Sequence, residues 1–378
     1  MKIVLAPDSF KGSLTAPEVC EAMARGLRRA LPAAELASRP MADGGEGTLD
    51  AVLAAVGERG KREHAELTGA AGDRVRAAYG VIDATTAVIE VAQIVGITDA
   101  AGMHAHVDDR STRGIGELVA RLLDRGVRRF MIGLGGSSTN DGGSGLLHAL
   151  GVRLRDAAGG EVAPTPRGLA SLASVDIAAL DRRLGSCELS VMSDVDNPLC
   201  GAMGATAIFG PQKGVQADGI ERIDAVLRNF ASLAEAALAR PVADRPGSGA
   251  AGGLGFALQL LGGSVRSGAA VVADLVRLDE ALAGADWAIT GEGRSDRQTL
   301  LSKAPFVVAR RADAHGVPVT LLSGAVDPAA LADLHGHFAG CFALPHGPMS
   351  LDDCIRDASA LLTARAEALG YLIAAAVK

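Results

Sequence analysis

Aromatic residues make up only 3% of this 378-residue sequence, and the formal net charge at pH 7 is -7. Proteins that bind single-stranded nucleic acid need aromatic side chains for base stacking, and polyanion binders usually carry a basic surplus. The composition therefore argues against nucleic acid and anionic membrane surfaces as partners. It leaves open small anionic ligands held by local groups.

Long apolar runs and paired cysteines are also missing. No stretch approaches the roughly 18 uninterrupted apolar residues of a membrane span, and the apolar run at residues 3–6 is too short for a secretory signal. The five cysteines are odd in number and never occur in CxxC spacing, which argues against a disulfide framework and a zinc site. The eight histidines also lack the spacing of metal ligands. We therefore expect a cytoplasmic protein.

The pattern of apolar residues predicts an α/β fold. Residues 2–6 are apolar without alternation, as in a strand buried on both faces, and strand-helix alternation follows at both ends of the chain. Consecutive strands between residues 63 and 91 interrupt this alternation. The sequence thus predicts a parallel-sheet domain formed by residues 1–66 and 286–378, interrupted by a second α/β domain at residues 67–285.

The stretch MIGLGGSSTNDGGSG, residues 131–145, joins a short buried strand to a helical pattern through glycines and small hydroxyl residues. Such a turn can present backbone N–H groups and the positive end of a helix dipole to phosphate or carboxylate. We therefore expect N–H groups here to face a ligand, with Gly135 and Gly136 as binding residues. An ordinary βα turn is the alternative.

The loop PDSFKGS follows the first predicted strand. In open α/β sheets, ligands bind at the loops that leave the carboxyl ends of strands. Asp8, Ser9 and Lys11 are therefore candidate site residues. They could equally be the solvated polar residues of an ordinary loop.

A pair of carboxylates, Asp194 and Asp196, follows another predicted strand. If the backbone stays extended, residues two apart point to the same side. Two carboxylates so placed offer hard oxygen ligands to Mg²⁺, while nucleotide phosphates supply the others. The alternative is an Asx turn before Asn197 and Pro198.

Three further glycine-rich turns recur, at residues 41–48, 247–252 and 290–299. The second, GSGAAG, matches GxGxxG, but a predicted helix precedes it, so we infer no dinucleotide site and treat it as an anion-accommodating turn. In the third, Gly291 and Gly293 are candidate phosphate-binding residues.

Charged residues accompany these turns. Glu292 and Asp296 add carboxylates, and Lys11, Arg294 and Lys303 add positive charge. Backbone donors, cations and a divalent metal are what phosphoryl transfer requires. The P-loop, GxSxG and HExxH patterns are absent. From the residues alone, phosphoryl transfer and small-anion binding both remain open.

Six motifs occur in order along the whole chain: APDSFKGSLTA, MADGGEGT, GLGGSSTNDGGSG, SDVDNPLCG with GPQKG, TGEGRSDRQTL with SKAP, and PMSLDD. This set resembles the bacterial glycerate kinase family without a P-loop (type 1, glycerate 2-kinase). The resemblance implies a flavodoxin-like α/β domain interrupted by a second α/β domain, with the active site in the cleft between them. It also implies ATP- and Mg²⁺-dependent phosphorylation of D-glycerate at the 2-hydroxyl.

The resemblance also suggests roles for residues at matching motif positions. Asp194 and Asp296 would handle metal or the substrate hydroxyl, and Asp194 and Asp196 would bind Mg²⁺. Lys11 and Arg294 would hold the glycerate carboxylate or the transferring phosphate. The remaining residues that it places in the site are Asp8, Ser9, Asp43, Glu46, Ser137, Asn140, Asp141 and Glu292.

The expected partners are D-glycerate and ATP, with Mg²⁺ as cofactor, and neither nucleic acid nor membrane. A homodimer is left open. The alternatives are a glycerate 3-kinase, a kinase of a related small hydroxy acid, and a non-catalytic small-acid or nucleotide sensor.

Overall fold

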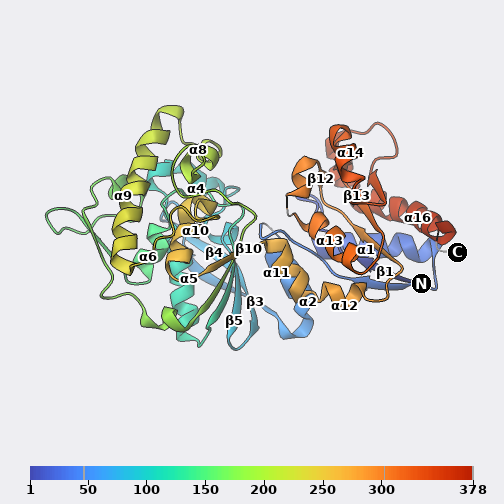
Figure 1. Cartoon of the computed structure of the whole chain (residues 1–378), viewed down its shortest axis with the longest axis horizontal. Coiled ribbons are helices and arrows are strands. Elements are labelled where there is room, and N and C mark those ends of the chain that lie inside the picture. The colour runs from blue at the N-terminus through green and yellow to red at the C-terminus, as the bar shows by residue number, and fades with distance from the viewer. Residues whose placement is uncertain (46, 302, 377–378) are drawn as a thin grey trace. The chain divides into compact units, whose positions relative to one another are not determined.

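The structure is a computed structural model that describes residues 1–45, 47–301 and 303–376 (Figure 1). It is a mixed α/β protein with two main sheets, both containing parallel strands. None of the helices in the described ranges has both the length and the apolar character that spanning a membrane requires.

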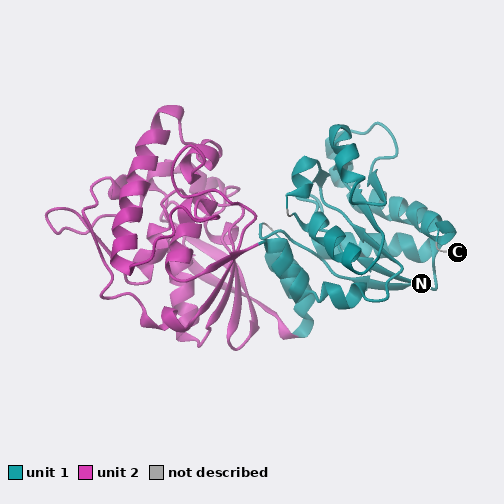
Figure 2. Cartoon of the chain, in the orientation of Figure 1, with its two compact units in different colours: residues 1–58, 267–378 teal, residues 59–266 magenta. Residues whose placement is uncertain are grey.

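The chain divides into two compact units, coloured separately in Figure 2. Unit 1 consists of residues 1–58 and 267–378, and unit 2 of residues 59–266. Unit 2 is therefore an insertion in the chain of unit 1.

Unit 1 has a parallel sheet of five strands in the order β15-β13-β11-β1-β2. Read from β2, this is the flavodoxin-like order 2-1-3-4-5, so the sheet reverses direction of winding between β1 and β11. The strands are β1 (Lys2–Leu5), β2 (Glu35–Ser38), β11 (Trp287–Thr290), β13 (Val319–Ser323) and β15 (Gly340–Ala343), and a separate pair is β12 (Arg294–Ser295) with β14 (Ala325–Val326).

The helices of unit 1 begin with clear local signals. Thr15 and Glu18 form a capping box at the start of α1, and the first turn contains a proline. Helix α1 packs along α16, and Leu27 and Ile373 are buried in the same cluster. The helices are α1 (Ala16–Ala30), α2 (Thr48–Val56), α11 (Gly268–Leu275), α12 (Leu278–Leu282), α13 (Ala304–Ala314), α14 (Leu331–Leu334), α15 (Leu351–Arg356) and α16 (Ala358–Ala376), with 3₁₀ turns η1 (Gly57–Arg59), η6 (Arg297–Leu300) and η7 (Pro328–Ala330).

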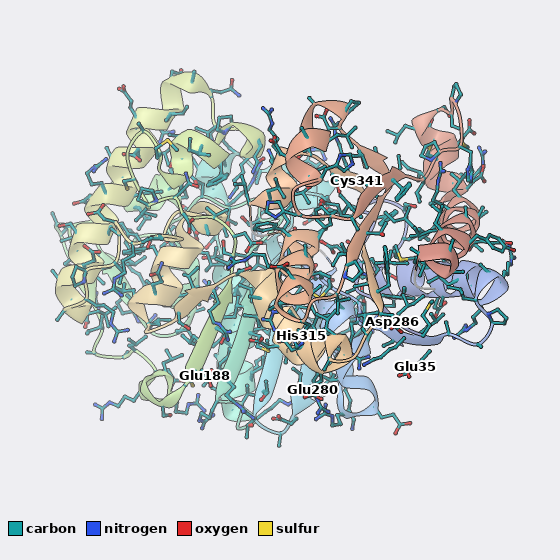
Figure 3. All side chains as sticks on the ribbon, turned by 45° about the vertical axis from the view of Figure 1, so that its right-hand side comes forward. Glu35, Glu188, Glu280, Asp286, His315 and Cys341 are labelled. Atoms are coloured by element: carbon teal, nitrogen blue, oxygen red, sulfur yellow. The ribbon has the colours of Figure 1, made fainter. Side chains whose placement is uncertain are left out.

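The two edges of this sheet differ in character. Glu35 and Asp286, labelled in Figure 3, mark the amino ends of β2 and β11. Asp286 accepts a hydrogen bond of 2.7 Å from the backbone N–H of Lys2. This hydrogen bond joins the amino ends of β1 and β11, and the carboxyl ends of both strands lie at the opposite edge.

Close packing at the carboxyl end of β11 requires glycine at position 291. A β-carbon there would lie 1.8 Å from the carbonyl oxygen of Leu322 in the neighbouring strand β13. The carbonyl oxygen of Gly291 also accepts the N–H of Asp8 at 2.8 Å, which joins the loops after β1 and β11. Gly291 therefore sets the spacing of the strands beneath these loops.

We expect Gly291→Ala to lower the free energy of unfolding by about 1–3 kcal/mol, because an overpacked backbone must move to relieve the clash. Gly347→Ala in the same unit is the matched control, since a β-carbon there meets nothing within 4 Å. Chemical denaturation of both variants measures the difference. Equal stability of the two variants would contradict the packing argument.

Unit 2 has a six-stranded sheet in the order β10-β9-β6-β5-β4-β3. Strands β5, β6, β9 and β10 are parallel, whereas β3 and β4 extend the sheet as an antiparallel meander. The strands are β3 (Lys61–Thr68), β4 (Arg74–Asp83), β5 (Thr86–Glu90), β6 (Arg129–Gly133), β9 (Glu188–Met192) and β10 (Ser264–Arg266), and a small separate pair is β7 (Arg153–Arg155) with β8 (Ser174–Asp176).

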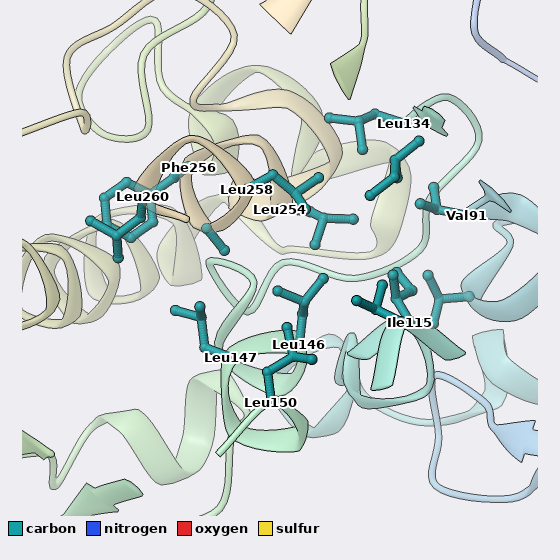
Figure 4. Packing of buried hydrophobic residues seen from close by; sticks show 14 of the residues in the cluster. Val91, Ile115, Leu134, Leu146, Leu147, Leu150, Leu254, Phe256, Leu258 and Leu260 are labelled. Atoms are coloured by element: carbon teal, nitrogen blue, oxygen red, sulfur yellow. The ribbon is translucent and has the colours of Figure 1, made fainter. Parts of the chain in front are cut away.

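The core of unit 2 lies between this sheet and its helices. Figure 4 shows part of it, where Leu146 and Leu147 of α6 meet Leu254 and Leu258 of α10 in one buried cluster. The helices are α3 (Ala92–Val95), α4 (Ala100–His104), α5 (Arg113–Asp124), α6 (Ser144–Ala149), α7 (Pro166–Leu169), α8 (Ala205–Phe209), α9 (Ile220–Leu238) and α10 (Ala250–Leu260), with 3₁₀ turns η2 (Val107–Asp109), η3 (Arg182–Ser186), η4 (Pro211–Lys213) and η5 (Ala217–Gly219).

The observed unit boundaries differ from those expected at residues 66 and 286. Strand β3 pairs along its whole length with β4, so residues 59–66 belong to unit 2. Helices α11 and α12 contact α13, and α11 also contacts α2, so residues 267–285 belong to unit 1. The sequence pattern indicated where the helices and strands lie, but the unit to which each belongs depends on its tertiary contacts.

Candidate active site

A pocket of about 660 Å³ opens in unit 1 above the carboxyl ends of β1 and β11. This is the position where the strand order reverses, and open α/β sheets bind ligands there. Hydrogen bonds from Ala6 to Ile289 and from Asp8 to Gly291 hold the two strand ends side by side. The polar side chains that line the pocket are Asp8, Ser9, Lys11, Ser13, Asp43, Glu292, Arg294 and Lys303.

Asp8 is a buried carboxylate in the pocket wall, with 4% of its surface exposed. Its Oδ1 accepts the N–H of Ser9 at 2.6 Å. Burial raises the pKa of Asp8 well above its usual range, and the negative charge of Asp43 raises it further. A carboxyl group with a raised pKa that faces a pocket is suited to accept a proton from a bound hydroxyl group.

Glu292 is the second buried carboxylate of the pocket. Its Oε1 accepts hydrogen bonds from the hydroxyl groups of Thr299 at 2.6 Å and Ser295 at 3.0 Å. Burial raises the pKa of Glu292, although these hydrogen bonds and the charge of Lys303 oppose the rise. The fixed orientation of its side chain suits Glu292 to hold a ligand or a cation in place.

Asp296 lies behind Glu292 and caps the 3₁₀ turn η6. Its carboxylate accepts the N–H of Gln298, and its own N–H donates to the hydroxyl of Thr299, the group that bonds Glu292. Among the described residues that line the pocket, Asp296 does not appear. The geometry supports a role in positioning Thr299 and does not support the predicted contact with the substrate hydroxyl.

Three cations line the pocket in loose ion pairs. The Nζ atom of Lys11 lies 3.7 Å from Asp43, that of Lys303 lies 3.8 Å from Glu292, and a guanidinium nitrogen of Arg294 lies 3.9 Å from Asp327. These separations exceed ordinary hydrogen-bond lengths. The Arg294–Asp327 pair is the most exposed of the three, so Arg294 can exchange its partner for an oxygen of a carboxylate or phosphate at small cost.

Part of the pocket lining is apolar. Met349, Leu351 and Ile355 contribute to it while remaining 41%, 73% and 40% exposed. Exposed large apolar side chains around a hollow often mark a binding site. The pocket therefore combines charged side chains with apolar side chains that can contact a flat heterocycle.

Ser9 adds an unpaired polar atom to the pocket wall. Its Oγ is buried and has no hydrogen-bond partner among the described residues. Gly47 lies beside it, since a β-carbon at that position would be 3.5 Å from this oxygen. A polar group bound in the pocket beside Ser9 would satisfy the Ser9 hydroxyl.

In unit 2, the predicted anion-binding turn after β6 is engaged internally. The N–H groups of Ser138 and Gly142 donate to the carbonyl oxygens of Val95 and Gly252. The stretch from Ser137 to Asn140 is buried. The expectation that the N–H groups of this turn face a ligand is therefore wrong for residues 138 and 142–146, because other protein groups accept their hydrogen bonds. The acceptors for residues 138, 142 and 146 come from other segments, and Asp141 of the turn itself accepts from residues 143–145.

The carboxylate of Asp141 supplies several of these partners. It is 0% exposed and accepts hydrogen bonds from the N–H groups of Thr112, Gly143 and Gly145 and from the Thr112 hydroxyl. It therefore caps the start of α6 and ties the turn to α5. We assign Asp141 to positioning of the turn, in place of direct contact with a ligand.

Other polar side chains of the turn are buried beside it. Asn140 donates to Thr206 Oγ1 at 3.0 Å, whereas its own Oδ1 and the hydroxyl of Thr139 have no hydrogen-bond partner within the described ranges. Ser137 accepts a hydrogen bond of 3.0 Å from the Nζ atom of Lys213. The turn is thus a buried polar cluster.

The turn GSGAAG packs against this cluster. A β-carbon on Gly252 would lie 2.1 Å from the carbonyl oxygen of Thr139, and Gly252 has a positive φ of 67°. The predicted use of this turn to accommodate an anion is therefore not supported. Its glycines allow two backbones to approach closely.

Asp194 and Asp196 lie in the irregular segment that follows β9. Asp194 is half-buried and Asp196 is exposed. Among the residues that the structure describes, no group of three or more His, Cys, Asp or Glu side chains could hold a metal ion. A Mg²⁺ ion at these two carboxylates would therefore need water or substrate oxygens to complete its shell.

Comparison with known proteins identifies the family. A sequence model described as "Glycerate kinase family" matches residues 3–374. The chain belongs to the glycerate kinase family. The resemblance inferred from the ordered motifs is thereby confirmed.

Individual relatives cover nearly the whole chain. The glycerate kinase of Bacillus subtilis (strain 168) is 42% identical over 95% of this chain and 94% of its own length. The glycerate 2-kinase of Escherichia coli (strain K12) is 41% identical, with the same coverage of 95% and 94%. A crystal structure from Salmonella typhimurium LT2, described as a glycerate kinase 2, superimposes with a TM-score of 0.88 at 42% identity, covering 100% of this chain and 99% of that one.

The residues that the glycerate kinase family motifs predicted fall into two groups. Glu46 lies outside the described residues. Unit 1 contains Asp8, Ser9, Lys11, Asp43, Gly291, Glu292, Gly293, Arg294 and Asp296, and unit 2 contains Gly135, Gly136, Ser137, Asn140, Asp141, Asp194 and Asp196.

Two buried cations, Lys213 and Arg110, were not among the predicted site residues. Lys213 is 1% exposed and Arg110 is 3% exposed, and both donate hydrogen bonds to the turn after β6. Lys213 lies in the motif GPQKG, which is part of the family resemblance and could have identified it. No motif signalled Arg110, because its role depends on contacts between distant segments.

Proposed function

We propose that this chain is an ATP-dependent glycerate kinase that transfers the γ-phosphoryl group of ATP to the 2-hydroxyl of D-glycerate. Membership of the glycerate kinase family supports phosphoryl transfer to glycerate. The choice of the 2-position follows the relative named glycerate 2-kinase. The unit 1 pocket carries the proposal structurally, because it places buried carboxylates, cations and an apolar wall in one hollow.

We assign the nucleotide base and the reacting groups to different side chains of this pocket. The apolar side chains contact the adenine base, and the cations Lys11, Arg294 and Lys303 stabilise the transferring phosphate or the glycerate carboxylate. Asp8 accepts the proton of the glycerate hydroxyl as the new bond to phosphorus forms. Glu292 orients Lys303.

Mg²⁺ is proposed as the cofactor, held by Asp194 and Asp196. Bound Mg²⁺ would neutralise the charge that develops on the phosphate oxygens. Carboxylate oxygens are the ligands that Mg²⁺ prefers, so the donor set fits the ion.

Asp194→Asn should raise the Mg²⁺ concentration needed for half-maximal activity by at least about tenfold, the usual cost of losing even a second-shell partner. Binding of Mn²⁺ in the presence of ADP, measured by electron paramagnetic resonance, gives a readout independent of turnover. Asp218→Asn is the control, since Asp218 is an exposed carboxylate of the same unit. Unchanged Mn²⁺ affinity in the Asp194 variant would contradict the metal assignment.

The activity is tested by incubating the protein with ATP, Mg²⁺ and D-glycerate and identifying the product by NMR. We expect 2-phosphoglycerate. A 3-phosphoglycerate product would reverse the regiochemistry, and preferred phosphorylation of lactate or tartronate would change the acceptor. Calorimetric binding of D-glycerate without turnover would identify a sensor instead of an enzyme.

A further inference from the structure

Lys213 is a buried lysine at the end of the 3₁₀ turn η4 in unit 2, and only 1% of its surface is exposed. Its Nζ atom donates to the Oγ of Ser137 at 3.0 Å and to the carbonyl oxygen of Thr139 at 2.7 Å. A buried ammonium group is costly unless its surroundings use the charge. These contacts join Lys213 to the turn after β6.

The hydrogen bond from Lys213 determines how Ser137 can be used. An ammonium group has donors and no acceptor, so the oxygen of Ser137 must accept. The hydroxyl proton of Ser137 then needs an acceptor of its own, and no other partner of this hydroxyl is found in the parts of the chain that the structure describes. Ser137 retains 6% exposure and directly follows the exposed Gly136.

Two charged groups face Lys213 from neighbouring segments. Burial lowers the pKa of Lys213 to about 7, while the charge of Asp141 raises it and that of Arg110 lowers it. Arg110 also donates to the carbonyl oxygens of Ser138 and Lys213. An added negative charge near Ser137 would favour the ammonium form and raise this pKa.

We propose that Lys213 is a positioning residue whose ammonium form fixes the Ser137 hydroxyl as a hydrogen-bond donor to an oxyanion of the ligand. The oxyanion is a carboxylate or a phosphate, and its binding draws one proton from solvent onto a neutral Lys213 amine. The choice of ligands rests on the proposed function. The proton uptake depends on these buried groups alone.

The sign of the pH dependence follows from this linkage. The ammonium form binds the anion better, so the bound state has the higher pKa. Affinity is therefore constant below pH 7, falls as the pH rises through about 7, and levels off above the pKa of the bound state. Between pH 7 and the pKa of the bound state, we expect the affinity to fall by at most about tenfold per pH unit.

Isothermal titration calorimetry at pH 8, in two buffers with different ionisation enthalpies, measures the proton uptake. D-glycerate probes a carboxylate and ADP probes a phosphate, and the ionisation of ADP itself cancels in the difference between the wild type and Lys213→Met. Uptake of up to one proton with D-glycerate assigns the carboxylate, and uptake with ADP assigns the phosphate. If neither probe shows more uptake in the wild type than in Lys213→Met, the proposal is overturned.

A double-mutant cycle separates this role from simple support of the fold. Ser137→Ala and Lys213→Met should each weaken binding of the responding probe roughly ten- to a hundredfold, as expected for a hydrogen bond to a charged group. The double variant should bind the probe about as weakly as whichever single variant binds it less tightly, because Lys213 acts through Ser137 and its loss adds nothing once Ser137 is replaced. Fully additive losses would overturn the proposal.

Three controls keep the outcome decisive. Lys61→Met removes an exposed lysine of the same unit and should leave binding and proton uptake unchanged. Lys213→Arg keeps the charge and should restore part of the lost affinity. If Lys213→Met fails to fold, Ser137→Ala provides the reference, and persistence of full proton uptake in that variant would overturn the proposal.

The product assay distinguishes this inference from the proposed function. Phosphorylation of D-glycerate without proton uptake at Lys213 would overturn the inference alone. Absence of both binding and phosphoryl transfer would overturn the two together.

Discussion

Asp8→Asn is expected to lower kcat by about 10²- to 10⁴-fold, the usual contribution of a positioned general base. Asparagine keeps the shape of the side chain but cannot take a proton from the glycerate hydroxyl. Asp8 lines the unit 1 pocket, and burial disfavours its charged form, so a neutral amide there should affect chemistry more than folding. Steady-state kinetics with D-glycerate and ATP measure the change, and thermal unfolding checks that the fold is retained.

The pH profile of the same reaction tests the role of Asp8 independently. A base must be deprotonated, so kcat/KM should fall as the pH drops through the pKa of Asp8. Burial and the charge of Asp43 raise this pKa, so the acidic limb should lie above the usual aspartate range near about 4. Asp43→Asn should move the limb to lower pH. A limb that does not move, together with near-normal kcat in Asp8→Asn, would exclude Asp8 as the base.

Asp141→Ala should reduce the free energy of unfolding by about 3–5 kcal/mol, the range found when one partner of a buried charged network is removed. The substitution leaves the N–H groups of Thr112, Gly143 and Gly145 buried without the acceptor they now share. Chemical denaturation measures the loss.

A neighbouring serine supplies the control for this prediction. Ser144 is also fully buried, but its hydroxyl has no hydrogen-bond partner in the described ranges, so Ser144→Ala should leave stability unchanged or slightly raised. If Asp141→Ala is as stable as the wild type but no longer binds D-glycerate or ADP, Asp141 contacts the ligand directly and the positioning role is wrong.

The architecture of unit 1 could be predicted because its elements carry strong local signals. The buried strand at residues 2–5 and the capping box of Thr15 and Glu18 are visible in the sequence and present in the structure. Flavodoxin-like topology came from the family resemblance, and the strand order confirms it. The exact ends of the inserted unit were not predictable, because α11 and α12 belong to unit 1 only through their contacts with other helices of that unit.

The grouping of side chains in the unit 1 pocket was predictable for a related reason. Asp8, Lys11 and Glu292 lie in the loops after parallel strands, and the carboxyl ends of adjacent parallel strands lie at one edge. Lys303 was recognised as a nearby positive charge, but its distance to Glu292 depends on where α13 begins. Sequence spacing therefore predicted that these side chains gather at one edge of the sheet, but it did not predict the individual ion pairs.

The turn after β6 shows where local reasoning failed. Glycines and hydroxyl residues at a strand-to-helix junction suit an anion site, but whether the N–H groups remain available depends on distant segments. Here the carbonyl oxygens of Val95 and Gly252 and the hydroxyl oxygen of Thr112 accept hydrogen bonds from backbone N–H groups of the turn and of the start of α6. Its connection to a ligand now depends on Ser137 and the buried Lys213.

A crystal structure of Asp8→Asn with Mg²⁺, D-glycerate and a non-hydrolysable ATP analogue would show whether both substrates bind in the unit 1 pocket. We expect the adenine against the apolar side chains of this pocket, and the glycerate 2-hydroxyl within about 2.6–3.2 Å of the residue 8 side chain. Nucleotide and glycerate bound elsewhere, with this pocket occupied by solvent, would contradict this expectation.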